Sequence, residues 1–155
     1  MGLAADVNLD LEMGMAFPEL AEEWDQAQAG RPRSGWVDAL PTFDPADKPK
    51  LSTRAAGAAV MAAFQPYTPT MVGGAADLVE STRTTFDGAG AYSRHFAARN
   101  VPFGIREHGM GAVVNGMALH GGVFKPYGST FLIFSDYMRP AIRLSALMHL
   151  PVVWA

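Results

Sequence analysis

Short apolar runs alternate with helical patterns along most of this chain. The runs are rich in hydrophobic residues and lie at 70–74, 101–105, 123–127 and 151–155. Each has the length of a buried strand. Helical patterns follow at 107–121 and 130–150, the second with an expected break at Pro140. Strands that alternate with helices predict an α/β fold, with a mostly parallel sheet flanked by helices.

Two more helices are expected before the first strand. Pro18 and the acidic residues after it suit the first turn of a helix over 18–29. Ser52 or Thr53 is well placed to cap another helix, which Pro66 would end. Both helices precede the alternating strands and helices, so the predicted fold class stays α/β.

The chain divides into two parts by composition. Proline, glycine and aspartate are frequent over 30–50, which is typical of an irregular linker. We therefore predict a helical and irregular N-terminal linker, 1–35, followed by one domain, 36–155. The last apolar run, 151–155, has no helix after it to cover the sheet. We expect the domain to be truncated at its C-terminus.

Composition narrows the class of protein. Of the 155 residues, 49% are hydrophobic and 17% are charged, which suits one globular domain. The net charge is −3 and no basic block is present, so we expect no nucleic-acid partner. No apolar run reaches the ~18 residues of a membrane span. Cysteine is absent, which fits a reducing compartment, and we expect a cytoplasmic protein.

Glu107 directly follows an apolar run and opens a helical pattern. A glutamate in a first turn has an ordinary explanation, because its charge complements the helix dipole by about 0.3–1 kcal/mol. The alternative is a buried carboxyl group at a strand end, where parallel sheets bind ligands. Such a group would share a proton with a nitrogen base of the ligand. Position alone leaves both interpretations open.

Three aromatic residues recur at intervals of three, namely Phe131, Phe134 and Tyr137. Aromatic side chains at helical spacing usually belong to a core. They would also form a flat apolar slot for a heteroaromatic ring, which gains roughly 0.5–1.5 kcal/mol by stacking. The spacing is compatible with either a core or a binding slot.

Two polar groups near the first apolar run are also candidates. Asp77 follows two glycines, Gly73 and Gly74, which let the backbone approach a ligand, although aspartate is also a common turn residue. Arg54 lies in an expected first helical turn, where it is either solvated or an anion clamp, with Ser81 as a possible hydroxyl partner. The four histidines lack metal-ligand spacing, so we predict no metal site in this chain.

Two long strings join these candidates into one family pattern. The string FGIREHGMGAVVNGMALHGG, followed by KPYGSTFLIFSDYMRPAIRLSALM, resembles the pyrimidine-binding domain of transketolase, a thiamine diphosphate-dependent enzyme. The resemblance runs from about Trp36 to Ala155 and includes LSTRAAG at Arg54 and VGGAADL at Asp77. IREHGMG points to transketolases, because other enzymes with this cofactor usually carry a GIAEQ-type string. The implied fold is the pyrimidine type of thiamine diphosphate-binding domain.

The resemblance implies a binding site for the cofactor's aminopyrimidine ring. Glu107 is similar to the catalytic glutamate that hydrogen-bonds N1′ of that ring. Phe134 resembles the aromatic residue that stacks on the ring, with Phe131 and Tyr137 completing the pocket. The family pattern thus favours the functional interpretation of both the carboxyl group and the aromatic spacing.

The resemblance also implies contacts to the rest of the cofactor and to the substrate. Asp77 and Leu78 look like the residues beside the thiazolium ring. Arg54 and Ser81 look like the pair that binds the phosphate of a sugar. Glu80 departs from the family pattern, because it puts a negative charge next to the proposed phosphate site.

The implied activity is transfer of a two-carbon ketol unit from a ketose phosphate to an aldose phosphate, as in the pentose phosphate pathway. The ligands of Mg²⁺ and of the diphosphate are expected on a missing domain or a second subunit. We therefore expect a homodimer in the full enzyme and no activity from this chain alone. The alternatives are a non-catalytic transketolase-like regulatory module and a fragment of a dihydroxyacetone synthase.

Overall fold

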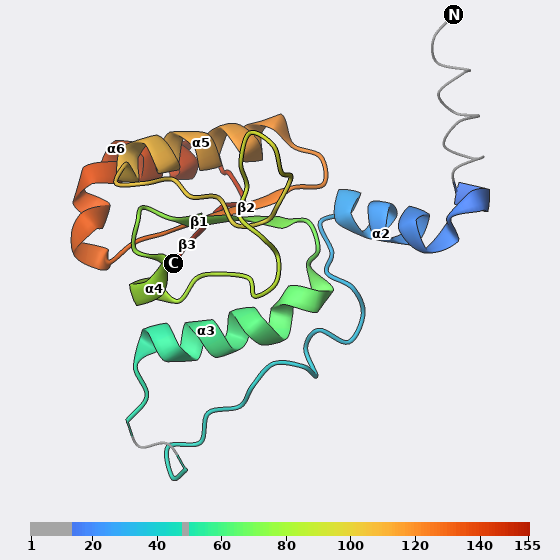
Figure 1. Cartoon of the computed structure of the whole chain (residues 1–155), viewed down its shortest axis with the longest axis horizontal. Coiled ribbons are helices and arrows are strands. Elements are labelled where there is room, and N and C mark those ends of the chain that lie inside the picture. The colour runs from blue at the N-terminus through green and yellow to red at the C-terminus, as the bar shows by residue number, and fades with distance from the viewer. Residues whose placement is uncertain (1–13, 48–49) are drawn as a thin grey trace, which may run out of the picture.

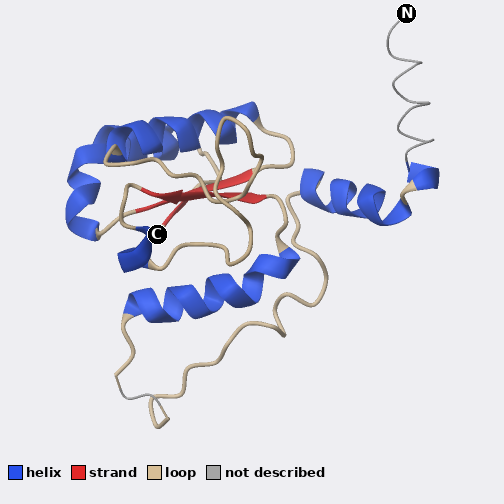
Figure 2. Ribbon diagram, viewed as in Figure 1, coloured by secondary structure: helices blue, strands red, loops and turns tan. Residues whose placement is uncertain are grey.

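A small parallel sheet lies between two layers of helices in the computed structural model, which describes residues 14–47 and 50–155. Figures 1 and 2 show helices α5 (Glu107–His120) and α6 (Ser135–Leu147) together over one face of the sheet, and helix α3 (Thr53–Phe64) on the opposite side. The predicted α/β class and the parallel sheet are confirmed.

The sheet has three strands in the order β1-β2-β3, all of them parallel. They are β1 (Met71–Ala75), β2 (Lys125–Ser129) and β3 (Val153–Trp154). Met71 pairs with Lys125 and Ala75 pairs with Ser129, so β1 and β2 begin and end together. The sheet therefore has two well-defined edges, one at the amino ends and one at the carboxyl ends of these strands.

The strand predicted at 101–105 does not form. One residue before it, Asn100, makes an isolated parallel bridge to Gly73, and the Val101 amide donates to the Gly73 carbonyl at 2.7 Å. The pairing then stops because Pro102 has no N–H to donate. Gly104 follows with φ of 67°, which turns the chain toward α5. The apolar run is thus a turning segment beside β1.

The strand predicted at 123–127 forms two residues later, at Lys125–Ser129. Gly121 and Gly122 both have positive φ, so the turn after α5 extends beyond them before the strand begins. Gly128 is inside the strand because it leaves room for a neighbour, since a Cβ there would lie 2.8 Å from the Trp154 ring. The hydrophobic pattern therefore predicted that a strand forms here, but it placed both ends of the strand two residues too early.

The helices on the amino-terminal side follow the predicted signals. Helix α2 spans Pro18–Gln28, with proline in its first turn. In α3, the Ser52 side chain accepts a hydrogen bond from the Ala55 amide at 3.4 Å, which identifies Ser52 as the cap. A short 3-10 helix, η1 (Gln65–Tyr67), ends this segment at the predicted proline.

The linker prediction, 1–35, is only partly covered, because residues 1–13 lie outside the described residues, as do 48–49 of the irregular stretch 30–50. The division at 35 stays a prediction. Over 14–47 and 50–155, every helix is too short or too polar to span a lipid bilayer.

Helix α6 continues through Pro140 rather than breaking there. Proline at this position removes one backbone hydrogen bond. Packing compensates, because Met138, Ala141 and Ser145 are buried in the same helix. The residues before α6 form a 3-10 helix, η2 (Leu132–Phe134), so the predicted helical segment 130–150 is two helices joined end to end.

The main core lies between the sheet and the α5–α6 layer. Its fully buried members are Ala76, Met110, Val114 and Met138. A polar pair adds a specific contact between the two helices. The Asn115 amide donates to the Ala141 carbonyl at 2.8 Å, and the Ser145 hydroxyl donates to the Asn115 side chain at 2.6 Å. Both buried polar groups are therefore satisfied, as a stable interior requires.

Gly111 sets how closely α5 and α6 approach. A Cβ at Gly111 would lie 2.6 Å from the Ala141 Cβ, whereas a Cβ at Gly116 in the same helix would have nothing within 4 Å. We predict that Gly111→Ala destabilises the domain by roughly 1–3 kcal/mol through overpacking. The control Gly116→Ala should stabilise it by about 0.5–1 kcal/mol through helix propensity. Urea unfolding measures both, and equal effects of the two variants would contradict the close contact.

A second buried cluster covers the opposite face of the sheet. The Tyr127 hydroxyl donates to the Thr84 carbonyl at 2.8 Å, and its ring meets Phe86 edge-on at 5.5 Å. The Arg99 guanidinium lies 4.2 Å from the centre of the Phe86 ring and donates to the Thr68 and Met71 carbonyls. This cluster fixes the long loop after α4 (Val79–Thr82) against β1 and β2.

The Tyr127 cluster predicts a loss of stability at high pH. Burial raises the pKa of Tyr127 from 10.0 to about 12, although the nearby Arg99 charge opposes the shift. The folded state therefore holds this proton more tightly than the unfolded chain. Its contribution is complete below the unfolded pKa of 10.0 and is lost as the pH rises through about 12. At 1.36 kcal/mol per pKa unit the loss is roughly 2–3 kcal/mol.

Urea unfolding between about pH 9 and pH 12 measures this loss. Tyr127→Phe should be less stable than wild type near neutral pH, because it loses a buried hydrogen bond. It should also show a smaller fall in stability with pH. Tyr92→Phe is the control, because Tyr92 is exposed. The same pH slope in wild type and Tyr127→Phe would contradict the prediction.

Candidate functional site

The candidate residues gather at the carboxyl edge of the sheet. Ala75 and Ser129 are paired at the ends of β1 and β2, and the Ala76 amide donates to the Ser129 carbonyl at 3.2 Å just beyond them. Asp77 and Phe131 each lie two residues past their strand end. The two loops therefore leave the sheet side by side, as expected for the ligand-binding edge of a parallel sheet.

Glu107 reaches the same edge from α5. The helix precedes the turn into β2, so it runs back along that strand and begins at the carboxyl edge. Met110, one turn after Glu107, has its sulfur 3.3 Å from where a Cβ at Gly128 would lie, near the end of β2. Glu107 as a whole residue is only 9% exposed. The two ion pairs within the described part of the chain are Arg33–Glu23 and Arg139–Asp136, so Glu107, a buried residue, has no cationic partner there.

The aromatic residues lie where the chain leaves β2. Phe131 precedes η2, Phe134 ends it, and Tyr137 lies in the first turn of α6. The Phe134 and Tyr137 rings stack with centroids 6.4 Å apart and planes at 19°. Phe134 is half-buried, whereas Tyr137 is 68% exposed. Because the larger part of this cluster faces outward, it is not a closed core.

The loop after β1 holds Asp77 in a left-handed conformation, with φ of 62°. Few residues other than glycine adopt it, and aspartate is among the most tolerant. Leu78 is the N-cap of α4, and its carbonyl accepts from the Ser81 and Thr82 amides at 2.9 and 2.8 Å. Asp77 is exposed and Leu78 half-buried at the sheet edge.

The structure brings Arg54 and Ser81 together although they are far apart in sequence. The Arg54 guanidinium donates to the Ser81 carbonyl at 3.4 Å. The contact therefore joins the first turn of α3 to α4. The Ser81 hydroxyl is not part of this contact. Arg54 is exposed, so the outer side of its guanidinium faces solvent and can receive an anion.

Two buried hydroxyl groups at the site were not singled out from the sequence. Ser129 Oγ and Thr130 Oγ1, at the end of β2, are buried without a hydrogen-bond partner. A buried polar group without a partner is costly, and in a native protein it often indicates a missing water or ligand. Serine and threonine are common in turns, so their residue types gave no signal. The one indication in the sequence was that both follow shortly after a predicted strand.

Metal ligands are not grouped in the described residues. Over 14–47 and 50–155, no three or more His, Cys, Asp or Glu side chains come close enough to hold a metal ion. The polar residues of the edge are a buried glutamate, an exposed aspartate, an arginine and two hydroxyl residues, beside a pair of stacked rings. That set suits a flat heteroaromatic ligand with a basic nitrogen and a neighbouring anion.

The fold and this edge define an α/β domain that presents its binding residues where parallel strands end. Comparison with known families is more specific. Residues 49–155 match the family model of the transketolase pyrimidine-binding domain. The chain belongs to the transketolase family.

Individual relatives agree with this assignment. Transketolase from Halalkalibacterium halodurans is 45% identical over 140 residues, which cover 90% of this chain and 21% of that protein. Transketolase from Physarum polycephalum is 46% identical over 92% of this chain and 21% of its own length. This chain thus spans about a fifth of the curated relatives that it matches.

Solved structures match the fold closely. A transketolase from Pichia stipitis in complex with sedoheptulose-7-phosphate superposes with a TM-score of 0.88 at 35% identity, covering 95% of this chain and 22% of that one. Transketolase from Leishmania mexicana gives the same TM-score at 33% identity. The parallel sheet and its flanking helices are therefore those of a transketolase.

Proposed function

We propose that this chain is the part of a transketolase that binds the aminopyrimidine ring of thiamine diphosphate, with Glu107 as the catalytic carboxyl group. The observation that carries this proposal is the burial of Glu107, without a cationic partner in the described residues, at the edge where the aromatic cluster stands. A glutamate that only complements the helix dipole can stay exposed to solvent, and glutamate residues are rarely buried without a charged partner.

The residues present fit the ring of this cofactor. The Phe134 face and its stacked neighbour Tyr137 offer an apolar surface for a planar ring, and Phe131 lies at the same strand end. The unpartnered hydroxyls of Ser129 and Thr130 would gain hydrogen bonds from a ligand or its waters. When bound, the cofactor supplies a carbanion centre that attacks the carbonyl of a ketose.

The residues of this chain would have two tasks. They would exchange a proton with the cofactor, and they would hold the cofactor and the substrate in place. The Glu107 carboxyl group would hydrogen-bond the ring nitrogen N1′ and exchange a proton with it. Asp77 and Leu78 would bound the slot from the β1 loop. Arg54, beside Ser81, would hold the phosphate of the sugar, because a guanidinium matches phosphate geometry.

The proposed reaction is transfer of a two-carbon ketol unit from a ketose phosphate to an aldose phosphate, in the cytoplasm and as part of the pentose phosphate pathway. The similar transketolase from Pichia stipitis was solved in complex with a sugar phosphate, which supports this substrate class. We further propose that Mg²⁺ and the diphosphate are held by residues of another domain or subunit.

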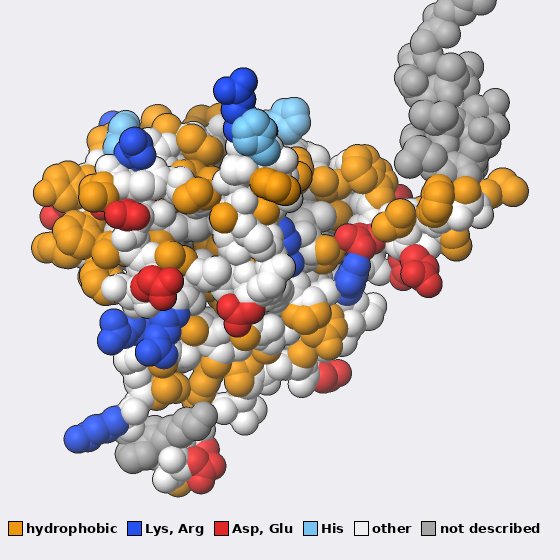
Figure 3. Space-filling view, viewed as in Figure 1, with side chains coloured by type: hydrophobic (Ala, Val, Ile, Leu, Met, Phe, Trp, Pro, Cys, Tyr) orange, Lys and Arg blue, Asp and Glu red, His pale blue; other side chains and the backbone are white. Residues whose placement is uncertain are grey.

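A homodimer is the assembly that we propose for the full enzyme. Figure 3 shows hydrophobic side chains gathered at the end of the molecule where Figure 1 draws the start of α6. The exposed members there include Leu132, at 88%, and Ile133. Exposed apolar patches of this kind favour association.

A chimera tests the proposed function. Residues 49–155, which match the family model, would replace the corresponding segment of the Halalkalibacterium halodurans transketolase, and ketol transfer between sugar phosphates would be assayed with thiamine diphosphate and Mg²⁺. We expect transfer activity, because the segment carries every proposed residue of the pyrimidine site. A folded, cofactor-binding chimera without transfer activity would contradict the proposal. An active chimera would also argue against a purely regulatory module.

A further inference from the structure

A separate pocket lies at the opposite edge of the sheet, where the strands begin. Its lining includes the first residues of all three strands, Met71, Lys125 and Val153. The cavity holds about 200 Å³ and is lined on one side by the end of α2 and the segment after it. The proposed cofactor site is at the carboxyl ends of the same strands, so the two sites are distinct.

Three cations line this pocket against a single carboxylate. They are Arg31, Arg33 and Lys125, and the carboxylate is Glu23, which gives 3 − 1 = +2. Glu23 is already occupied, because it forms an ion pair with Arg33. The Arg33 guanidinium also donates to the Pro66 carbonyl at 3.2 Å. Neither Arg31 nor Lys125 belongs to the ion pairs of the described residues.

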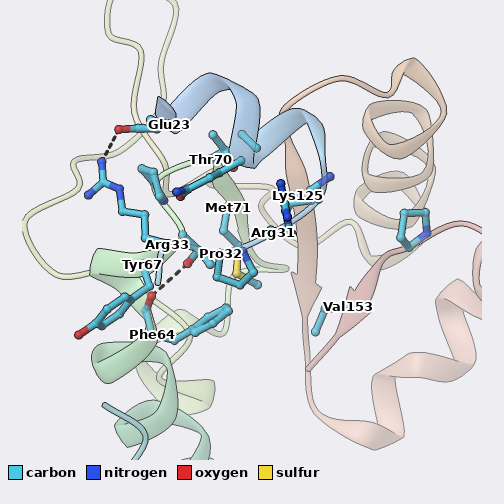
Figure 4. A pocket seen from close by; sticks show the side chains of 16 residues that line it. Glu23, Arg31, Pro32, Arg33, Phe64, Tyr67, Thr70, Met71, Lys125 and Val153 are labelled. Carbon is cyan, nitrogen blue, oxygen red and sulfur yellow. Dashed lines mark hydrogen bonds and ion pairs between the residues drawn. The ribbon is translucent and has the colours of Figure 1, made fainter. Parts of the chain in front are cut away.

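Arg31 and Lys125 both line one part of this pocket. The Lys125 Nζ lies 3.7 Å from where a Cβ on Gly30 would stand, directly beside Arg31 in the chain. Figure 4 shows both side chains at the same side of the pocket, between the end of α2 and the start of β2. Neither cation has an anionic partner among the described residues, so their charges on this side of the pocket favour an anion.

Most of the remaining wall is apolar, beside the polar side chains of Gln26, Thr68 and Thr70. Its apolar residues include Pro32, Phe64, Tyr67, Met71 and Val153. Figure 4 shows the Phe64 and Tyr67 side chains on the side of α3, away from Arg31 and Lys125. A ligand that fills the space would thus have a charged end and an apolar end. At about 200 Å³ the space is below the 300–1,000 Å³ typical of drug-sized ligands.

We propose that this pocket binds a small organic phosphate monoester with an apolar body, distinct from the sugar-phosphate substrate. A phosphate monoester carries about −1.5 to −2 charges at pH 7, which balances the two free cations better than a carboxylate does. The Arg31 guanidinium would grip the phosphate oxygens with its planar fork, and Lys125 would add a point charge. The apolar body would pack against Tyr67 and Met71.

Titration calorimetry on the 155-residue chain tests the proposal, with three probes. Phenyl phosphate has both a charged phosphate and an apolar ring. Inorganic phosphate has only the charged group, and benzyl alcohol has only the apolar ring. We expect saturable one-site binding of phenyl phosphate, binding of inorganic phosphate at least about 10-fold weaker, and no measurable binding of benzyl alcohol. Higher salt should weaken the binding of phenyl phosphate, because screening reduces the charge contribution.

Variants identify the site. Arg31→Gln and Lys125→Met should each weaken phenyl phosphate binding about 10-fold or more, since charged hydrogen bonds contribute about 1.5–3 kcal/mol. Arg143→Gln, on α6, removes an equal charge far from the pocket and should have no effect. Arg54→Ala should also have no effect, which separates this pocket from the proposed substrate site. Circular dichroism checks that each variant is folded.

Three outcomes would overturn the proposal. They are no saturable binding of phenyl phosphate at millimolar concentration, unchanged affinity in both Arg31→Gln and Lys125→Met, and loss of binding in Arg54→Ala. If Lys125→Met fails to fold, Arg31→Gln decides, because Arg31 is exposed and its replacement leaves the strand intact. None of these results depends on ketol transfer, so the proposed function stands or falls separately.

Discussion

Glu107→Gln should reduce the exchange of the cofactor's C2 proton by roughly 10²–10⁴-fold in a complete transketolase that contains this chain. Glutamine keeps the volume of the side chain and some hydrogen bonding, but its amide does not ionise and so cannot give a proton to N1′ and take it back. Thiamine diphosphate should therefore still bind, with a much smaller change in affinity than in rate. Proton–deuterium exchange followed by NMR measures the rate, and calorimetry measures the affinity.

A matched control separates the role of Glu107 from a general change of charge. Glu80→Gln removes the same charge from an exposed position on α4, at the same sheet edge. It should leave the exchange rate close to that of wild type. Wild-type exchange in Glu107→Gln would exclude a catalytic carboxyl group at this position and would favour the dipole explanation of a first-turn glutamate.

The local features of this fold were predictable because they depend on neighbours in sequence. The Ser52 cap needs only the helix start, and the accepted hydrogen bond from the Ala55 amide confirms it. The apolar run at 70–74 became β1 because it is short, branched and followed by residues that turn. In both cases the residues that determine the structure lie within a few positions of it in the sequence.

Features that depend on distant parts of the chain were not predictable. The run at 101–105 is apolar enough for a strand, but Pro102 stops the pairing that Asn100 begins with Gly73. Proline alone suggests a break inside α6 at Pro140, yet burial of that helix against α5 maintains it. In both cases tertiary context decided between two local preferences.

The candidate site was predicted from the resemblance of sequence motifs to a family, and not from the chemistry or spacing of single residues. Position alone did not decide whether Glu107 is functional, and its burial is visible only in the structure. The contact between Arg54 and Ser81 joins residues 27 positions apart, which no periodic pattern could indicate. The unpartnered hydroxyls of Ser129 and Thr130 were missed because their residue types carry no special signal.

Arg54→Ala should raise the apparent KM for phosphorylated sugars by about 10–100-fold in the same complete enzyme. The value follows from the 1.5–3 kcal/mol of charged hydrogen bonds and a tenfold change per 1.4 kcal/mol. Sugars without a phosphate should keep their KM, because the proposed partner of Arg54 is absent from them. The measurement is steady-state kinetics on matched pairs of phosphorylated and unphosphorylated donors.

Two further variants make the test specific to the guanidinium. Arg54→Lys keeps the charge but loses the planar fork, so its KM for phosphorylated sugars should lie between those of wild type and Arg54→Ala. Arg143→Ala removes an exposed arginine from α6 and should change neither KM. Since the Arg54 side chain also contacts the Ser81 carbonyl, its loss would disturb α4 and affect every substrate if the role were structural. Equal losses with phosphorylated and unphosphorylated sugars would therefore assign Arg54 to the packing of α3 on α4 and remove it from the substrate site.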